Sequence, residues 1–118
     1  MSRRPSALAP LGEFEIVVLL AVLHLTQRDE TQSYGSTIVR EIAHRTGRDV
    51  SRGAVYVTLD RLETKGLLAS RSGGKTPERG GRPRRYFRPT PAGLAAAKHS
   101  VATIARMYAA LEPLLGDL

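Results

Sequence analysis

Apolar side chains recur at helical spacing in three stretches in the first half of the chain. The first stretch, residues 10–28, is apolar on nearly every side. Such a helix must be buried on more than one face, so part of it is expected to meet a second subunit. The second stretch, residues 34–46, has Ile38 and Ile42 one turn apart, and Gly47 follows as a typical C-terminal residue.

The polar residues of these stretches define where each helix begins and what it exposes. Arg40, Glu41 and Arg45 are expected to lie on the solvent side of the second helix. Ser51 is a suitable N-cap for a third helix that ends near residues 65–66. The apolar side of this third helix consists of Val55, Leu59 and Leu62, at spacings of four and three.

After the third helix the apolar residues no longer follow helical spacing, which indicates a change to a β-hairpin. Residues 67–71 and 84–88 suit two short strands, with Tyr86 and Phe87 on opposite faces of the second strand. Residues 72–83 contain four glycines and two prolines, so they are expected to form a long projecting loop.

The C-terminal part predicts one helix over residues 90–118, with Thr90 as N-cap and Pro91 at the first helical position. Its apolar residues follow a heptad pattern, which is typical of a helix that pairs with a partner. They are Leu94, Val101, Ile104, Tyr108, Leu111 and Leu115. Together with Phe14 and Val18 of the first helix, these residues are the predicted contacts of a homodimer.

These elements predict a mainly α-helical fold with a small β-hairpin. Three helices followed by two strands around a basic loop are typical of a winged helix-turn-helix domain, here residues 10–89. Residues 1–9 are basic and proline-broken and are expected to be a flexible arm. Residues 90–118 form the predicted C-terminal dimerisation helix.

Charge and composition narrow the class of partner. The 118 residues carry 18 Lys and Arg against 11 Asp and Glu, for a formal charge of +7, which favours nucleic acid as a partner. The absence of cysteine excludes a disulfide framework and thiol catalysis and is consistent with a cytoplasmic protein. The longest apolar run, residues 16–23, is too short to span a bilayer, and we expect no signal peptide and no membrane partner.

Four sequence motifs resemble those of the PadR family of bacterial transcriptional regulators. They are Leu11-Gly12-Glu13-Phe14-Glu15; Tyr34-Gly35 followed by Ile38; Ser51-Arg52-Gly53-Ala54-Val55-Tyr56 with Leu59, Arg61-Leu62-Glu63 and Gly66-Leu67; and Arg84-Arg85-Tyr86-Phe87-Arg88-Pro89-Thr90-Pro91-Ala92-Gly93. The resemblance implies a homodimer that represses promoters, and in some members a small molecule releases the DNA. The C-terminal part resembles the short subfamily with one C-terminal helix.

Two residues depart from the family pattern. Val57 stands where many members have proline after the tyrosine. Pro89 stands where leucine or isoleucine is usual, which predicts that the second strand ends early.

The candidate DNA contacts lie on three elements. At the start of the third helix and on its outer side, Arg52, Gly53 and Val57 are expected to meet base edges, with Ser51, Tyr56 and Arg61 beside them. Core packing is the alternative role for Tyr56, and an ion pair with Glu63 the alternative for Arg61. Tyr34 at the start of the second helix contacts a phosphate or belongs to the core. The basic loop and its strands contribute Lys75, Arg79, Arg82, Arg84 and Arg85.

The sequence indicates no enzyme, metal site or cofactor. His24, His44 and His99 lie on three different predicted helices, and no serine or carboxylate pair has catalytic spacing. Two alternatives to a repressor of an inverted repeat remain open. One is a sensor in which a small molecule at the dimer interface releases DNA. The other is a winged-helix module that binds nucleic acid generally, or another protein.

Overall fold

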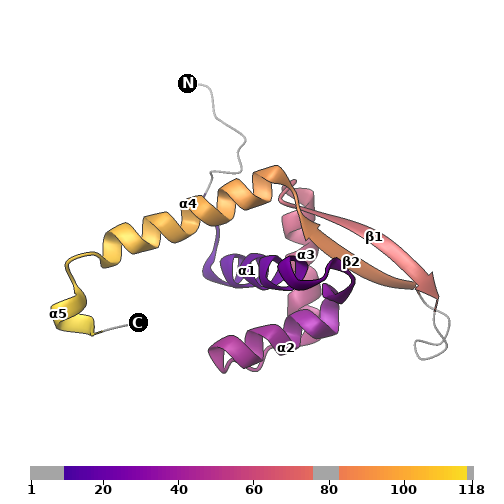
Figure 1. The fold of residues 1–118 in the computed structure, drawn as a ribbon, viewed down its shortest axis with the longest axis horizontal. Coiled ribbons are helices and arrows are strands. Elements are labelled where there is room, and N and C mark those ends of the chain that lie inside the picture. The colour runs from indigo at the N-terminus through magenta and orange to yellow at the C-terminus, as the bar shows by residue number, and fades with distance from the viewer. Residues whose placement is uncertain (1–9, 76–82, 117–118) are drawn as a thin grey trace, which may run out of the picture.

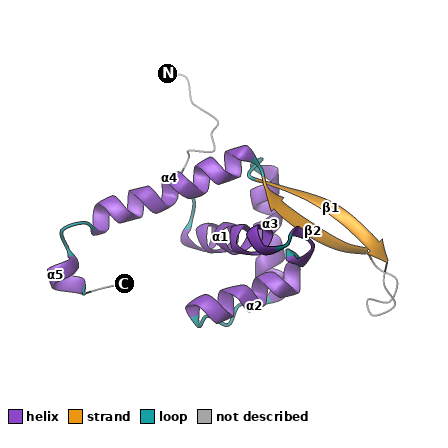
Figure 2. Ribbon diagram, viewed as in Figure 1, coloured by secondary structure: helices purple, strands orange, loops and turns teal. Residues whose placement is uncertain are grey.

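A computed structural model describes residues 10–75 and 83–116 of the chain. Helices α1, α2 and α3 form a bundle, the β1–β2 hairpin projects from one side of it, and α4 leads away to the short α5 (Figures 1 and 2). The elements are α1 (Glu13–Arg28), the 3₁₀ helix η1 (Glu30–Gln32), α2 (Gly35–Thr46), α3 (Arg52–Thr64), β1 (Leu68–Lys75), β2 (Pro83–Pro89), α4 (Pro91–Tyr108) and α5 (Glu112–Leu115). The predicted mainly helical fold with one hairpin is therefore confirmed.

The core lies where α1, α2, α3 and the base of the hairpin meet. The three predicted apolar residues of α3 are all fully buried, as are Ile38 and Ile42 of α2. Phe87 of β2 is the largest fully buried side chain, and it joins the hairpin to the helices. Tyr86 is only half-buried on the other face of the strand, as the alternation predicted.

The hairpin is longer than the sequence predicted. Its strands pair antiparallel, with Ser70 opposite Phe87 and Leu68 opposite Pro89, so the second strand does not end before Pro89. Proline is accommodated there because it is the last residue of the strand and needs to donate no further ladder bond. On the other side of β2, the Phe87 N–H donates to the Ser33 carbonyl at 3.0 Å, and Tyr34 forms an isolated bridge with Tyr86.

A close approach at Gly93 determines how α4 leaves the hairpin. The Thr90 hydroxyl accepts from the Gly93 N–H at 3.0 Å, so Thr90 is the N-cap that the sequence predicted. A Cβ at Gly93 would lie 1.9 Å from the Leu67 carbonyl oxygen. Any side chain at this position would push α4 away from the start of β1.

The C-terminal helix is interrupted, which corrects the prediction of one helix over residues 90–118. α4 ends at Tyr108, Ala110 has a left-handed φ of 72°, and a separate short helix follows. Pro113 explains the break, because proline lacks an N–H and its ring clashes with the carbonyl four residues earlier inside a helix. The Tyr108 hydroxyl instead donates to the Gly116 carbonyl, which folds α5 back.

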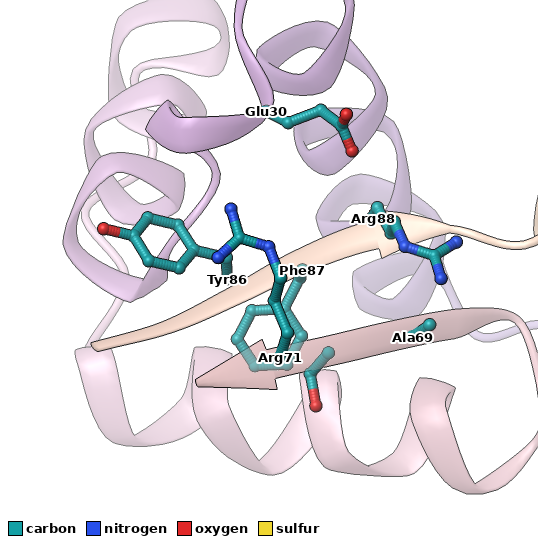
Figure 3. Close-up of a pocket in the computed structure, with 7 residues that line it drawn as sticks. Glu30, Ala69, Arg71, Tyr86, Phe87 and Arg88 are labelled. Carbon is teal, nitrogen blue, oxygen red and sulfur yellow. The ribbon is translucent and has the colours of Figure 1, made fainter. Parts of the chain in front are cut away.

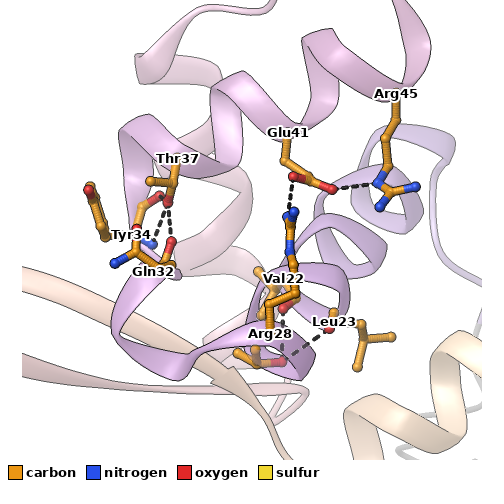
Figure 4. A network of polar contacts seen from close by, with 9 residues as sticks. Val22, Leu23, Arg28, Gln32, Tyr34, Thr37, Glu41 and Arg45 are labelled. Carbon is orange, nitrogen blue, oxygen red and sulfur yellow. Dashed lines mark hydrogen bonds and ion pairs between the residues drawn. The ribbon is translucent and has the colours of Figure 1, made fainter.

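Glu41 is buried rather than exposed, contrary to the sequence prediction. Only 7% of its side chain is accessible, and it accepts hydrogen bonds from Arg28, at 2.6 Å, and from Arg45 (Figure 4). Burial raises the pKa of Glu41, but the hydrogen bonds and charges of the two arginines outweigh it and hold the pKa below its ordinary value. This ion pair ties the end of α1 to the middle of α2.

We predict that Glu41→Gln destabilises the protein at neutral pH by about 1–3 kcal/mol, because both arginines lose a charged partner. Because the pKa of Glu41 is lower in the folded protein than in the unfolded chain, its ionised carboxylate stabilises the fold at pH values above the unfolded-state pKa. This stabilisation is lost as the pH falls through the folded-state pKa. The difference in melting temperature between wild type and variant should therefore shrink from pH 7 towards pH 3. Glu13→Gln is the control, since the Glu13 pair with Arg48 is exposed. If the difference in melting temperature were the same at all pH values, the ionised Glu41 carboxylate would not be the source of the stabilisation.

Candidate nucleic-acid interface

The exposed side of α3 has a narrow stripe of small and apolar residues. Ser51 caps the helix as predicted, accepting from the Ala54 N–H at 3.0 Å. Gly53 and Val57 lie one turn apart on the side opposite the core, Arg52 is exposed beside them, and 57% of Val57 is accessible. A Cβ at Gly53 would meet nothing within 4 Å, so packing within the chain does not require glycine there. The stripe is therefore a free surface at the start of the helix.

Arg61 is exposed on α3, one turn after Val57 and about 40° from it around the helix. It forms no ion pair with Glu63 or with any other residue in the described part of the chain. Its charge instead acts on Glu15 of α1, where burial raises the carboxyl pKa but the hydrogen bonds from Lys65 and the Gly12 N–H, together with the charges of Lys65 and Arg61, hold it below its ordinary value. Arg61 therefore lies on the outward side of α3, and the alternative ion pair with Glu63 is not formed.

Tyr56 packs against the beginning of α2. Its ring makes an edge contact with Phe87, with centroids 6.4 Å apart. A Cβ at Gly35 would lie 2.5 Å from the Tyr56 ring and hydroxyl oxygen. The tyrosine–glycine pair of the second motif is thus explained, because only glycine lets α3 approach the α2 N-terminus this closely. The packing role of Tyr56 is observed, and it brings the hydroxyl to a helix N-terminus that carries a partial positive charge.

The outer face of the hairpin carries a stack of alternating arginines and tyrosines. The Arg84 guanidinium lies 3.9 Å from the Tyr34 ring centre. The Arg71 guanidinium lies 4.6 Å from the Tyr86 ring centre, and Figure 3 shows these two side chains. The two tyrosines make an edge contact at 5.8 Å. Arg71 and Tyr86 face each other across the two strands, and Arg71 belongs to the basic wing, residues 71–88, that the sequence predicted to bind DNA. Tyr34 is therefore a platform that positions Arg84.

The Tyr34 ring holds Arg84 in place, and no carboxylate of the described residues neutralises its charge. Its Nε is buried with no hydrogen-bond partner, and it forms no ion pair within residues 10–75 and 83–116. Cation–π contact orients a guanidinium but does not neutralise it. The guanidinium can therefore still bind an anion near the α2 N-terminus.

Arg85 points to the opposite face of β2 and is already paired. It donates to Asp60 at 3.1 Å and to Glu63 at 2.8 Å, both on α3. The sequence placed Arg85 among the DNA contacts and predicted no contact between Arg85 and α3. The structure instead joins the two, because successive residues of a strand face opposite sides.

The arginines of α3 and the hairpin are mostly unpaired, whereas several cations of the helical body are paired. Arg28, Arg45, Arg48 and Lys65 each bond to a glutamate of α1 or α2. No ion pair is found within the described ranges for Arg52, Arg61, Arg71, Arg84 or Arg88. Arg40 of α2 and Lys98 and Arg106 of α4 are also without an ion pair in the described ranges, so unpaired cations are more frequent on α3 and the hairpin but not confined to them. Arg79, Arg82 and the arm at 1–9 lie outside the described residues, as does the side chain of Lys75.

The residues predicted to meet a second subunit divide into two groups. Val18 is fully buried in the core of its own chain, so its side chain is not available to a partner and its assignment is corrected. Phe14 is half-buried against the same core beneath Arg48. The predicted residues of α4 and α5 other than Tyr108 are exposed, namely Leu94, Val101, Ile104, Leu111 and Leu115, as are Met107 and Leu114.

Two other features are absent from the described part of the chain. It contains no cluster of three or more His, Cys, Asp or Glu side chains arranged to hold a metal ion. None of the helices described there has the length and apolar character needed to cross a membrane.

Comparisons with known proteins agree with this geometry. Residues 22–99 match the model of the transcriptional regulator PadR-like family. The chain is 42% identical over 87 residues to the transcriptional regulator Rv3488 of Mycobacterium tuberculosis, covering 73% of this chain and 75% of that protein. The crystal structure of a PadR family transcriptional regulator from Eggerthella lenta is similar, with a TM-score of 0.66, 27% identity, and coverage of 90% of this chain and 88% of that one. A PadR family regulator from Clostridium difficile has the same fold, with a TM-score of 0.66, 20% identity, and coverage of 89% and 100%.

We predict that Arg84→Gln weakens binding to duplex DNA of any sequence and lowers the slope of log affinity against log salt by about one unit, as the loss of one phosphate contact should. The measurement is a series of fluorescence-anisotropy titrations at increasing salt. Lys98→Gln removes one exposed charge on α4 and is the matched control. If both variants keep the wild-type slope, Arg84 does not contact a phosphate.

Proposed function

The chain belongs to the PadR-like family of transcriptional regulators, which are not enzymes, and we propose that it is a homodimeric repressor that binds an inverted repeat in double-stranded DNA. The proposal places the protein in the cytoplasm with that DNA. The observation that carries it is the free stripe of α3 together with the unpaired arginines on the hairpin, whereas Arg28, Arg45 and Lys65 bond to glutamates of the helical body.

The proposed contacts with phosphates come from two elements. Arg84, oriented by the Tyr34 ring, is a cation held beside the start of α2. The Tyr56 hydroxyl lies against Gly35, the first residue of that helix. A helix N-terminus favours an anion through its dipole and its free N–H groups, so these groups suit one backbone phosphate. Arg71, stacked on Tyr86, adds a second cation on the same face of the hairpin.

The proposed contacts with bases come from the start of α3. In helix-turn-helix proteins, the N-terminal residues of the recognition helix reach base edges in the major groove. Arg52 is suited to the acceptors of a guanine and Val57 to the methyl group of a thymine. Gly53 lets the helix backbone approach the groove, and no atom of the described residues lies within 4 Å of the place where its Cβ would be.

The proposed dimer is supported by the second half of α4. α4 is buried only near its start, at Gly93, Ala96 and Ala97, and then extends away from the helical bundle (Figure 1). Beyond that point Ile104 is 62% exposed, Met107 74% and Leu114 79%. Apolar side chains that form a continuous exposed surface are typical of a protein–protein interface. A second copy, related by a two-fold axis, would place two α3 helices on two half-sites about one turn of DNA apart.

A second candidate function is regulation by a small molecule. An open, mostly apolar groove of about 220 Å³ lies between α1 and α2, with Val17, Leu20 and His24 on one side. A flat apolar ligand suits such a lining. A ligand screen by thermal shift, followed by DNA titration with each hit, tests it, and hits that leave DNA affinity unchanged would argue against this function.

The proposed function is tested by selecting bound duplexes from a random DNA pool and measuring the salt dependence of binding to the selected sequence. We expect enrichment of an inverted repeat and a steep fall of affinity with salt. Reduced transcription in vitro from a promoter that carries the selected site would support repression. A pool without any enriched motif would contradict sequence-specific binding by the protein.

Gly53→Ala separates folding from recognition. Alanine is favoured over glycine in a helix by up to about 1 kcal/mol, and its methyl group meets no other atom of the chain here, so the melting temperature should stay equal or rise. The same methyl group would lie between α3 and the groove, so affinity for the selected site should fall more than affinity for random DNA. Equal losses on both duplexes would contradict base recognition at this position.

Ile104→Asp should convert the dimer to a monomer, because it places a charge in the proposed apolar interface. Light scattering measures the mass of the particle. Arg106→Asp introduces the same charge roughly on the opposite side of α4, about 200° away around the helix, and should leave the mass unchanged. A dimeric Ile104→Asp protein would exclude this face as the interface.

A further inference from the structure

Two consecutive arginines on β2 have opposite surroundings. Arg84 lies on the outer face of the hairpin, over the Tyr34 ring, and has no ion pair among the described residues. Arg85 lies on the inner face, between the hairpin and α3. The two side chains differ in direction because they follow each other in a strand, and this gives them different partners.

Arg85 joins three elements. One of its terminal nitrogens donates to Asp60, and the other donates to Glu63 and, at 3.3 Å, to the Ser70 hydroxyl of β1. The Ser70 hydroxyl in turn donates to the second oxygen of Glu63 at 2.8 Å. The guanidinium also lies 4.8 Å from the centre of the Phe87 ring. We name these four residues, Arg85, Asp60, Glu63 and Ser70, the Arg85 network.

The network connects α3 to the hairpin at a point nearer the projecting end than the core contacts. Phe87 and Leu68 hold the base of the hairpin in the core. Arg85 pairs with Ser72, which is further along β1 towards the projecting end. The planar fork of arginine fixes direction as well as distance when it bonds to two carboxylates. The network therefore restrains the angle between the hairpin and α3.

We propose that Arg85 is a positioning residue for DNA recognition, which sets the angle between hairpin and α3 and does not itself bind DNA. This inference rests on the proposed function. Two carboxylates already neutralise the Arg85 charge, and a phosphate at this position would be repelled by both of them. α3 and the hairpin can contact one duplex together only if their angle fits it. Arg85 therefore determines specificity, whereas Arg84 contributes affinity.

The test compares Arg85→Gln with Arg84→Gln, its neighbour on the opposite face of the strand. The measured quantities are the salt slope of binding and the ratio of affinities for the selected site and for random DNA. Arg85→Gln should keep the wild-type salt slope and lose on the order of tenfold in the affinity ratio, as expected for loss of charged hydrogen bonds. Arg84→Gln should lower the slope by about one and change the ratio little.

A charge exchange tests whether the network itself is responsible. Arg85→Glu should lose selectivity, and adding Glu63→Arg should restore part of it, because the exchanged pair can bridge the same two elements. Asp60→Asn, an exposed change that leaves the hairpin sequence intact, should lower the affinity ratio without lowering the salt slope. It keeps the test valid if an Arg85 variant fails to fold.

Two outcomes would overturn the positioning role of Arg85, and a third would overturn the proposed DNA binding itself. A salt slope lowered by about one in Arg85→Gln, with the affinity ratio retained, would make Arg85 a phosphate contact and overturn the inference. Wild-type selectivity in both Arg85→Gln and Asp60→Asn would also overturn it. If the wild-type protein bound no duplex, the proposed function would fail first, and the inference with it.

Discussion

The structure depends on the burial of Phe87 between the hairpin and the three helices. The ring is fully buried, its backbone N–H donates to Ser33 before α2, and Tyr56 of α3 contacts its edge. One residue of the second strand thus joins every element that the proposed interface uses. Because a strand alternates faces, burying Phe87 also determines that Tyr86 and Arg84 lie on the outer face and Arg85 on the inner one. The roles proposed for the two arginines follow from this single packing contact.

Electrostatic pairing separates the helical body from the proposed interface. Glu15 and Glu41 are buried carboxylates that each hold basic side chains within the bundle, and their lowered pKa values reflect those partners. On the outer face of the hairpin, by contrast, arginines pack on tyrosine rings instead of carboxylates. The rings orient the arginines but do not neutralise their charge. The net charge of +7 indicates an anionic partner only in general terms. The positions of the unpaired basic side chains indicate where such a partner would bind.

The sequence predicted the order of the elements well and their ends less well. Helical spacing identified the buried residues of α3, and Ser51 and Thr90 act as the caps that their positions indicated. The heptad pattern at the C-terminus predicted too long a helix, because it counted apolar residues and ignored Pro113, which disfavours a continuous helix through this position. Glu41 was misplaced for a related reason. Periodicity assigns a face to a side chain but does not identify the neighbouring helix that covers that face with a paired arginine.

What the amino-acid sequence by itself determined is local: the three helices, the hairpin, the caps and the excess of positive charge. These follow from spacing, turn residues and composition, which act between residues close in the chain. The tertiary structure alone decided which basic residues are paired within the chain and which are left free. Arg84 and Arg85 are adjacent and chemically identical, and only the elements packed on either side of β2, Tyr34 on one face and Asp60 with Glu63 on the other, distinguish them. Contacts between residues far apart in the chain depend on how the elements pack, and no local pattern contains that information.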